Sequence, residues 1–440
     1  MTTSVQRNEA RSTVRPQRLL DRAGGERGAP SALTERAARA TCHKLMSRMT
    51  LDRLTVVEDG EISLYGATDG ELEAAIEIHD ARAWTALLRE GSIGLGRGYF
   101  EGWWDSDDPT TVVRIIIRNI EPVDELRNQF TEATSWLTNR LRRLHPSRAA
   151  NLRRRNREDI ASHYDLGNEF FQLFLDETLT YSSAIFPSAE AALAEGSAYK
   201  YDRLLSKIGV QSGHRLLEIG TGWGGFALRA ADTTGCSVTT TTISDEQLKE
   251  ARRRVAVAGR SDSVELLNRD WRDLEGQFDR IVSIEMIEAV DWLDYDHYFR
   301  TIESCLVPDG LVAIQAICVP DRRYERTKNT EDFIRRFVFP GGFLPSLGAI
   351  GRSVSSATRL QMVDVEDLSA HYAETLRRWR LRFDEREEEV QALGLDQRFI
   401  RLWRFYLAYC EAGFLERHCT VNQIILAGRR WRPNDLSLRP

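Results

Sequence analysis

Short apolar runs alternate with amphipathic segments of helical length from Asp159 onward. Strands that alternate with helices on this period favour a mostly parallel sheet covered on both faces, which is an α/β architecture. The carboxyl edge of such a sheet is where ligands usually bind. The predicted strands are residues 216–219, 238–243, 264–267, 280–284 and 311–317.

The first third of the chain has a different pattern. A helical periodicity over residues 33–49 precedes two alternating runs that flank Asp59-Gly60, which is a hairpin signal. A further strand is predicted at residues 74–79, and the glycine- and aromatic-rich residues 91–105 are predicted as a loop. These elements predict a small α+β domain over residues 31–130.

Three further segments complete the predicted organisation. Residues 1–30 are rich in Arg, Gly, Ser and Thr and predict a disordered arm. Residues 131–158 form a basic linker, which holds eight arginines and no acid between residues 137 and 157. Either this linker is simply solvated, or Leu137, Leu141 and Leu144 give it an apolar face suited to an anionic membrane. Residues 159–432 form the α/β domain, and after residue 319 a helical insertion with a loop at 339–345 is expected to cap its site.

Composition narrows the class of protein. The chain has 440 residues, 42% of them hydrophobic, and a net charge of −6 from 60 basic and 66 acidic residues, so no global field selects nucleic acid. The six cysteines have no zinc-site spacing, and no metal is expected. No apolar run approaches the roughly 20 residues needed to span a bilayer, and no signal peptide is evident. We therefore expect a cytoplasmic protein that meets a membrane only at its inner surface.

Chemistry first becomes visible at a glycine turn after the first predicted strand of the sheet. Gly220, Gly222 and Gly224 follow an acid within that strand, Glu218. Missing Cβ atoms let backbone approach a ligand there. The glycine turn alone is weak evidence, because dinucleotide-binding enzymes use such turns too. An acid before such a turn can hold an ammonium group, which favours S-adenosylmethionine over NAD.

Several motifs together resemble the cyclopropane fatty acid synthase family of S-adenosylmethionine-dependent methyltransferases. The resemblance spans roughly residues 51–431 and is closest to the actinobacterial branch that makes methylene- or methyl-branched, tuberculostearic-type acyl chains. It implies a Rossmann-like class I methyltransferase domain after a small lipid-binding domain. The motifs are HYDLGNEFF (163–171), LTYSSAIF (179–186), LEIGTGWG (217–224), TISDEQ (242–247), SIEMIEAV (283–290), FPGGFLP (339–345) and HYAETL (371–376).

The resemblance also assigns residues to the methyl donor. Asp270 is the expected hydrogen-bond acceptor for the adenine amino group, and Trp271 either flanks the adenine or belongs to the core. The second strand, which ends at Ile243, lacks the acid that often binds a ribose diol, so hydroxyl and amide groups must bind the ribose. The other implied contacts are Tyr164, Tyr181 and Ser182 with Glu218, Gly220 and Gly222 near the methionine end, and Thr242 and Gln247 near the ribose.

The implied reaction methylates a cis double bond of an unsaturated phospholipid acyl chain through a carbocation, after which a base removes a proton. In the family a bicarbonate ion, held by Cys, Glu, His, an Ile amide and Tyr, is this base. Glu288, Ile317 and Tyr372 match that set, whereas Ser183 and Gln315 replace Cys and His. Both replacements can hydrogen-bond an anion without a positive charge. Glu288 then either orients the anion or, with a raised pKa, acts as the base itself.

The product and partners follow from this chemistry. Immediate loss of a methyl proton closes a cyclopropane, whereas a prior hydride shift gives an exocyclic methylene, which a weaker base favours. We therefore expect a methylene-branched chain, with cyclopropane formation and amine N-methylation as the alternatives. The expected partner is membrane phospholipid; a separate reductase and a homodimer are left open, and no nucleic acid is expected.

Overall fold

The structure, a computed structural model, describes residues 31–120 and 166–433. These residues form two compact units. Unit 1 joins the amino-terminal elements to residues 331–340 and 379–418, and unit 2 holds residues 167–330, 341–378 and the segment from Cys419. The predicted boundaries place residues 159–432 in one domain. The later segments of unit 1 depart from that division because their aromatic side chains pack with the amino-terminal helices.

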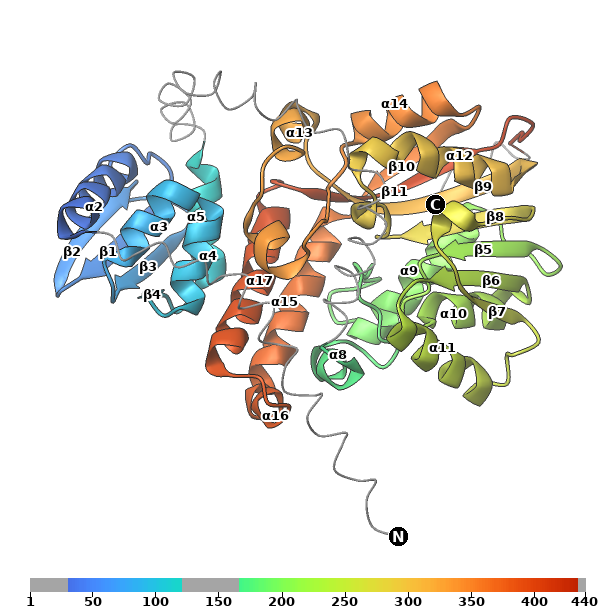
Figure 1. Cartoon of the computed structure of the whole chain (residues 1–440), viewed down its shortest axis with the longest axis horizontal. Coiled ribbons are helices and arrows are strands. Elements are labelled where there is room, and N and C mark those ends of the chain that lie inside the picture. Colours follow the sequence, from blue (N-terminus) through green and yellow to red (C-terminus); the bar gives the residue numbers. More distant parts are fainter. Residues whose placement is uncertain (1–30, 121–165, 434–440) are drawn as a thin grey trace, which may run out of the picture. The chain divides into compact units, whose positions relative to one another are not determined.

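Unit 2 is built on a seven-stranded sheet in the order β10-β11-β9-β8-β5-β6-β7 (Figure 1). Strands β5 to β9 are mutually parallel, as predicted, and β5 lies near the middle. Two strands beyond the predicted five, β10 and β11, add an antiparallel edge to β9. The strands are β5 (Arg215–Ile219), β6 (Ser237–Thr242), β7 (Val264–Asn268), β8 (Phe278–Ile284), β9 (Leu306–Cys318), β10 (Gln361–Asp367) and β11 (Thr420–Ala427).

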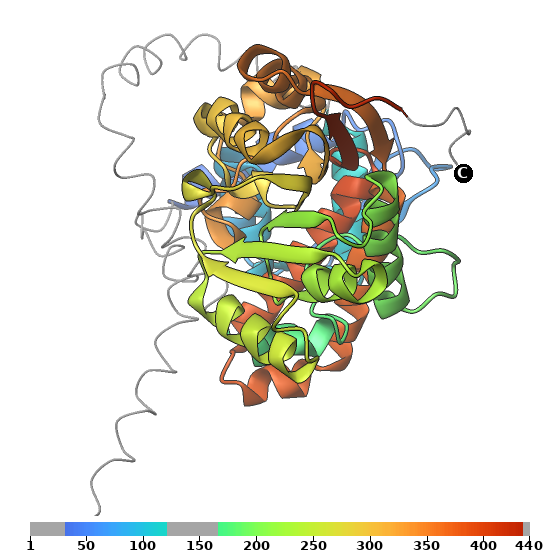
Figure 2. The same cartoon turned by 90° about the vertical axis from the view of Figure 1, so that its right-hand side faces the viewer.

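Helices cover both faces of this sheet (Figure 2). Successive residues of β5 belong to opposite cores, with Leu217 in one and Leu216 in the other. The first core packs against α12 (Tyr295–Cys305) and α14 (Leu347–Ala357), and the second against α9 (Leu193–Lys207), α10 (Gly225–Thr234) and α11 (Asp245–Val257). This confirms the α/β prediction. The remaining elements of unit 2 are α8 (Asn168–Phe174), α13 (Asp321–Thr327) and the 3-10 turns η2 (Trp271–Asp273), η3 (Ile287–Ala289) and η4 (Trp292–Asp294).

Unit 1 contains the predicted hairpin. Strands β1 and β2 pair antiparallel around Asp59 and Gly60, whose φ angles of 52° and 78° suit a tight hairpin turn. The sheet has the order β2-β1-β3-β4. Its strands are β1 (Arg53–Glu58), β2 (Glu61–Gly66), β3 (Glu73–Ile78) and β4 (Trp104–Asp105), and its helices are α2 (Ala32–Met46), α3 (Arg82–Glu90), α4 (Ser92–Phe100), α5 (Pro109–Arg118), α16 (Glu387–Ala392) and α17 (Gln397–Leu415). A π-helical turn, η5 (Ile334–Val338), belongs to this unit, and α15 (Ser369–Glu385) begins in unit 2 and ends in unit 1.

The prediction of a loop over residues 91–105 was wrong, because most of the segment is helix α4. Its glycines serve close packing rather than turns. A Cβ on Gly94 would lie 2.0 Å from the carbonyl oxygen of Ala86, and one on Gly96 would lie 2.2 Å from the ring of Phe333. Tertiary contact therefore overrides the low helix propensity of glycine here.

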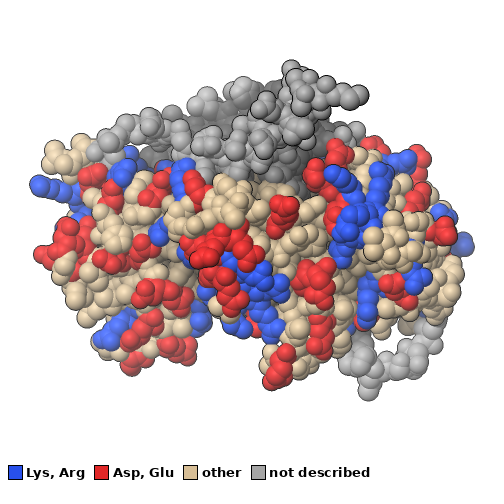
Figure 3. All heavy atoms as spheres, turned by 90° about the horizontal axis from the view of Figure 1, so that it is seen from below, with Lys and Arg blue, Asp and Glu red and all other residues tan. Residues whose placement is uncertain are grey.

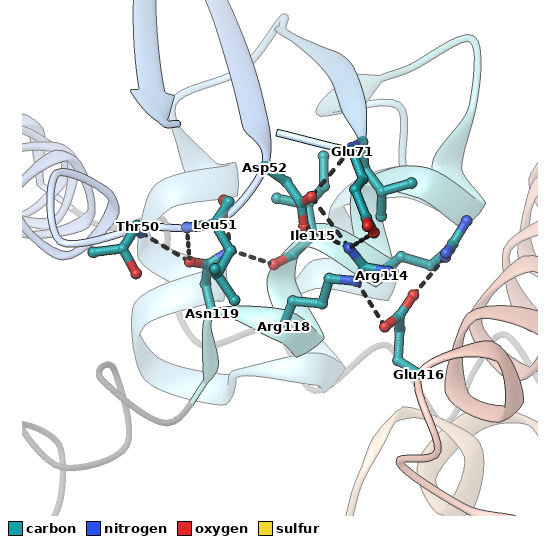
Figure 4. A network of polar contacts seen from close by, with 10 residues as sticks. Thr50, Leu51, Asp52, Glu71, Arg114, Ile115, Arg118, Asn119 and Glu416 are labelled. Carbon is teal, nitrogen blue, oxygen red and sulfur yellow. Dashed lines mark hydrogen bonds and ion pairs between the residues drawn. The ribbon is translucent and has the colours of Figure 1, made fainter. Parts of the chain in front are cut away.

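A partly buried polar network ties the start of β1 to α5 and the end of α17 within unit 1 (Figure 4). Arg118 pairs with Asp52, Glu71 and Glu416 at 3.2, 3.0 and 2.8 Å. Asn119 accepts from the backbone of residues 50 and 51. The three carboxylates raise the pKa of Arg118 above its usual range. These bonds fix the end of α5 against the sheet.

Charged side chains of both signs are intermixed on the face drawn in Figure 3. Within residues 31–120 and 166–433, none of the helices is long and apolar enough to cross a bilayer. The predicted arm at 1–30 and the basic linker at 131–158 lie outside the described residues. Their predicted roles remain predictions.

Candidate active site

The glycine turn follows β5 at the carboxyl edge of the sheet. Gly220, Gly222 and Gly224 have φ angles of 104°, 51° and 85°, which other residues rarely adopt. A Cβ on Gly222 would meet open space, whereas one on Gly220 would lie 3.2 Å from Cγ of Met286. Helix α10 starts immediately after the turn. The turn therefore presents exposed backbone at a helix N-terminus, where a polar ligand binds well.

Glu218 lies in β5 directly before this turn and is buried. Its Oε2 accepts a hydrogen bond of 2.6 Å from Thr240 of the neighbouring strand. Burial raises the pKa of Glu218 to about 8, against the lowering effects of Thr240 and Lys200. A buried carboxyl of this kind gains a large stabilisation from a cation. The position thus fits the ammonium group of S-adenosylmethionine.

Lys200 of α9 is buried, and its charge interacts with those of Glu218 and Glu285. Its ammonium donates to Oγ of Ser182 at 2.6 Å. Burial lowers the pKa of Lys200 to about 8, while the charges of Glu285, Asp176 and Glu218 raise it. Ser182, predicted at the methionine end, is therefore held by a buried cation.

Tyr181, also predicted at the methionine end, packs its ring against Phe171 and Phe174 of α8, with centroids 5.3 and 6.3 Å away. Its half-buried ring forms an apolar wall. Tyr164 lies outside the described residues, so its cofactor contact stays a prediction.

The two predicted ribose contacts lie together. Oγ1 of Thr242, at the end of β6, donates to Oε1 of Gln247 at 3.1 Å. Ser244 caps α11 by accepting from the backbone N–H of Gln247 at 3.3 Å. A hydroxyl and an amide thus lie together at the edge of the sheet, as the expected ribose contacts require, and the contacts themselves remain predictions.

Asp270 and Trp271, the two residues predicted to contact the adenine, already contact other residues of the chain. Arg272 donates to both carboxylate oxygens of Asp270 at 3.1 and 3.2 Å, so this acid already has a cation. Trp271 is buried in the sheet core against His297 and Tyr298. Of the two interpretations of Trp271, as an adenine contact or as a core residue, its packing agrees with the core residue. The adenine contacts themselves remain predictions.

A second cluster surrounds the carboxylate of Glu285, which directly follows β8. Its Oε1 accepts from the backbone N–H of Ser183 at 2.9 Å and from Nε2 of Gln315 at 2.8 Å, and its Oε2 accepts from the hydroxyl of Tyr372 at 2.8 Å. The hydroxyl of Ser183 instead donates to the carbonyl of Ala184. Three residues predicted to hold an anion therefore converge on a carboxylate of the chain itself.

Glu288 lies one turn further on, in η3. Its Oε1 accepts from the backbone N–H of Ile317 at 2.6 Å, which brings this predicted pair together. Among the described residues, its buried Oε2 has no hydrogen-bond partner. Burial, and then the neighbouring charge of Glu285, raise the pKa of Glu288 to about 8. The carbonyl of Glu288 accepts from the N–H of Phe343 at 2.8 Å, so the loop at 339–345 reaches the site.

The sequence patterns assign no role to Glu285 or Lys200. One signal points to Glu285, because it follows a central parallel strand at the sheet edge where ligands bind. Lys200 gives no such signal, since one lysine in an amphipathic helix normally lies in solvent.

A mostly parallel sheet, with an acid in β5 and three turn glycines directly after that strand, is typical of a Rossmann-like, S-adenosylmethionine-dependent methyltransferase. Residues 151–424 match the family described as mycolic acid cyclopropane synthetase, and the chain belongs to that family. Tuberculostearic acid methyltransferase UfaA1 of Mycobacterium tuberculosis is 41% identical over 403 residues, which cover 90% of this chain and 91% of that protein.

Other relatives agree with this membership. The cyclopropane-fatty-acyl-phospholipid synthase of Escherichia coli is 32% identical over 364 residues, covering 82% of this chain and 90% of that one. The solved structure of the cyclopropane synthase MmaA2 from Mycobacterium tuberculosis has a TM-score of 0.58 at 29% identity, covering 62% of this chain and 98% of that one. Coclaurine N-methyltransferase, at 19% identity and a TM-score of 0.56, covers 76% of this chain and 98% of its own and shares the fold alone.

Proposed function

We propose that this protein transfers the methyl group of S-adenosylmethionine to the cis double bond of an unsaturated phospholipid acyl chain and releases a methylene-branched chain. One observation carries the proposal. The methyl-donor turn at Gly220 adjoins Met286, which directly follows the Glu285 carboxylate. A cradle for a sulfonium donor and a site for a proton acceptor thus adjoin. The names of the tuberculostearic acid and cyclopropane synthase relatives support a lipid alkene as substrate.

Each part of the site has a task in this reaction. Glu218 and the glycine turn orient the donor so that its methyl group faces the alkene. The π electrons of the alkene form the new carbon–carbon bond as the sulfur–methyl bond breaks, and a carbocation remains on the neighbouring carbon. The apolar walls near Tyr181 exclude water that would otherwise quench it.

A base must then remove a proton, and two groups can act as this base. The family resemblance predicts a bicarbonate ion held by Ser183, Gln315, Ile317, Tyr372 and Glu288; the alternative is a carboxylate of the chain. A hydride shift before proton loss leads to the methylene product. Its conversion to a methyl branch then requires a separate reductase that supplies a hydride and a proton.

Peripheral contact with a phospholipid surface is part of the proposal. The acyl chain must leave its bilayer to reach a buried site. The basic residues between 137 and 157 have the composition for an anionic surface. The test is sedimentation of the protein with anionic and with zwitterionic vesicles, and equal binding to both would contradict an electrostatic contact.

The experiment that tests the function incubates the protein with S-adenosylmethionine and vesicles of unsaturated phospholipid, followed by mass spectrometry of the fatty acid esters. We expect a gain of one CH2 unit. Mild catalytic hydrogenation then adds two hydrogens to a methylene product and leaves a cyclopropane unchanged. Unaltered acyl chains refute the proposal, and methyl transfer to amines without lipid points to the N-methyltransferase alternative.

A further inference from the structure

The donors that surround Glu285 are arranged for an anion. A backbone N–H, a side-chain amide and a phenol hydroxyl, from Ser183, Gln315 and Tyr372, reach its two oxygens at 2.8–2.9 Å. Gln423 of β11 donates to the oxygen of the Gln315 amide at 3.1 Å, which turns the NH2 group toward Glu285. A carboxylate and a bicarbonate ion have a similar shape, because each presents two oxygens in one plane. Glu285 therefore already occupies donors that would otherwise bind the small anion.

We propose that the carboxylate of Glu285 is the general base of this enzyme and takes the place of bicarbonate. This inference rests on the proposed methyl transfer to a lipid alkene. In the step itself, a C–H bond of the transferred methyl group breaks and its proton goes to Glu285. The electron pair of that bond forms the exocyclic double bond after the hydride shift. The neutral carboxylic acid then returns its proton to solvent, so no further reactant is needed.

The backbone at Glu285 supports a functional role. Its φ angle is 49°, in the left-handed region that residues with a Cβ rarely adopt. Its N–H donates to the carbonyl of Gln315 at 2.8 Å, which holds the residue in this conformation. A glycine would suit the position without strain. Such unfavourable backbone persists where the side chain has a task.

The surroundings also separate the two neighbouring glutamates. Burial raises the pKa of Glu285, but the Lys200 ammonium and the three donors lower it. Glu288 receives one backbone N–H, and the charge of Glu285 raises its pKa further. Glu285 thus has one neighbouring cation and three donors that favour its ionised form, whereas Glu288 has one donor and a neighbouring like charge. A general base accepts its proton in the ionised form, so these contacts assign that role to Glu285 and leave Glu288 to position Ile317 and the loop at Phe343.

The test measures methyl transfer to unsaturated phospholipid vesicles in CO2-free buffer, with and without added sodium bicarbonate. The wild-type rate should not depend on bicarbonate. Glu285→Gln keeps the shape but cannot accept the proton, and its rate should fall by about 10²–10⁴-fold, the usual contribution of a general base. Glu285→Gly relieves the backbone and opens the anion position, so bicarbonate should restore much of its lost rate.

Two controls separate catalysis from folding. Asp262→Asn removes one charge from an exposed turn and should leave the rate unchanged. Calorimetric affinity for S-adenosylmethionine and the melting temperature should be retained in both Glu285 variants. A wild-type rate that falls without bicarbonate, or a Glu285→Gln rate within threefold of wild type, overturns the inference alone. A wild-type enzyme that modifies no lipid under either condition overturns the proposed function, and the inference with it.

Discussion

Replacing Glu218 with glutamine removes one negative charge before the glycine turn and keeps the shape of the side chain. The amide oxygen can still accept the hydrogen bond of Thr240, so the fold should be retained. What is lost is the charge that holds the ammonium group of S-adenosylmethionine. A hydrogen bond to a charged group contributes about 1.5–3 kcal/mol, which corresponds to a roughly 10- to 150-fold weaker affinity in Glu218→Gln.

The pKa of Glu218, raised to about 8 by burial, makes this loss depend on pH. At pH 7 about nine-tenths of this carboxyl is protonated in the free protein, so binding a cation should release close to one proton. The cost of that deprotonation falls as pH rises. The affinity difference between wild type and Glu218→Gln should therefore be small at pH 6 and should increase as pH rises to 8 and above.

Isothermal titration calorimetry in two buffers of different ionisation enthalpy measures both the affinity and the released proton. Glu265→Gln is the matched control, because this acid is exposed in β7 and bonds only to Thr239 among the described residues. It should bind and release protons as the wild type does. A Glu218→Gln protein with wild-type affinity at pH 8, or with unchanged proton release, would refute the assignment of Glu218 to the ammonium group.

Four further substitutions, with Lys207→Met as a control, test the packing and the charges. Gly96→Ala forces a Cβ into the ring of Phe333 and should lower the free energy of unfolding by about 1–3 kcal/mol. In Gly351→Ala the new Cβ meets open space in α14, so this change should raise the free energy of unfolding by about 0.5–1 kcal/mol. Denaturant unfolding measures both. The native-state pKa of Glu288, near 8, lies above its unfolded value, so stability should fall as pH rises from about 5 to 8, and melting temperatures of Glu288→Gln should fall less. Lys200→Met should raise the pKa of Glu218 and of Glu285 and shift the pH–rate profile to higher pH. The control Lys207→Met, on the same helix, should leave the profile in place. An unshifted profile in Lys200→Met contradicts the role of Lys200.

The sequence predicts the parallel part of the sheet well, because β5 to β9 each combine aliphatic or β-branched residues with flanking turn residues. The antiparallel strand β11 escapes prediction although its residues are almost all buried. It follows the long helix α17 directly, and an apolar run in such a context does not distinguish strand from helix. Helix α4 fails for the opposite reason, since glycines that usually mark a turn here admit the ring of Phe333.

In the candidate site too, residues close together in the sequence are predicted, whereas contacts between distant segments are not. Glu218 and the glycines are contiguous, so their spacing alone predicts a cradle. Glu285 acquires its surroundings from three distant segments, and its distance from Ser183 along the chain is 102 residues. No local pattern reports such a convergence. The motif comparison identified Ser183, Gln315 and Tyr372, but not which group they surround.

One buried cation links the two halves of the site. The charge of Lys200 lowers the pKa of Glu218 and of Glu285, so each carboxylate depends on it for its ionised form. At pH 7 Glu218 is mostly protonated in the free protein and releases its proton when the ammonium group of the donor binds. The ion pair that forms is as neutral as the acid that it replaces. The donor therefore supplies its own charge balance, and the Lys200 charge stays available to Glu285 with or without the donor.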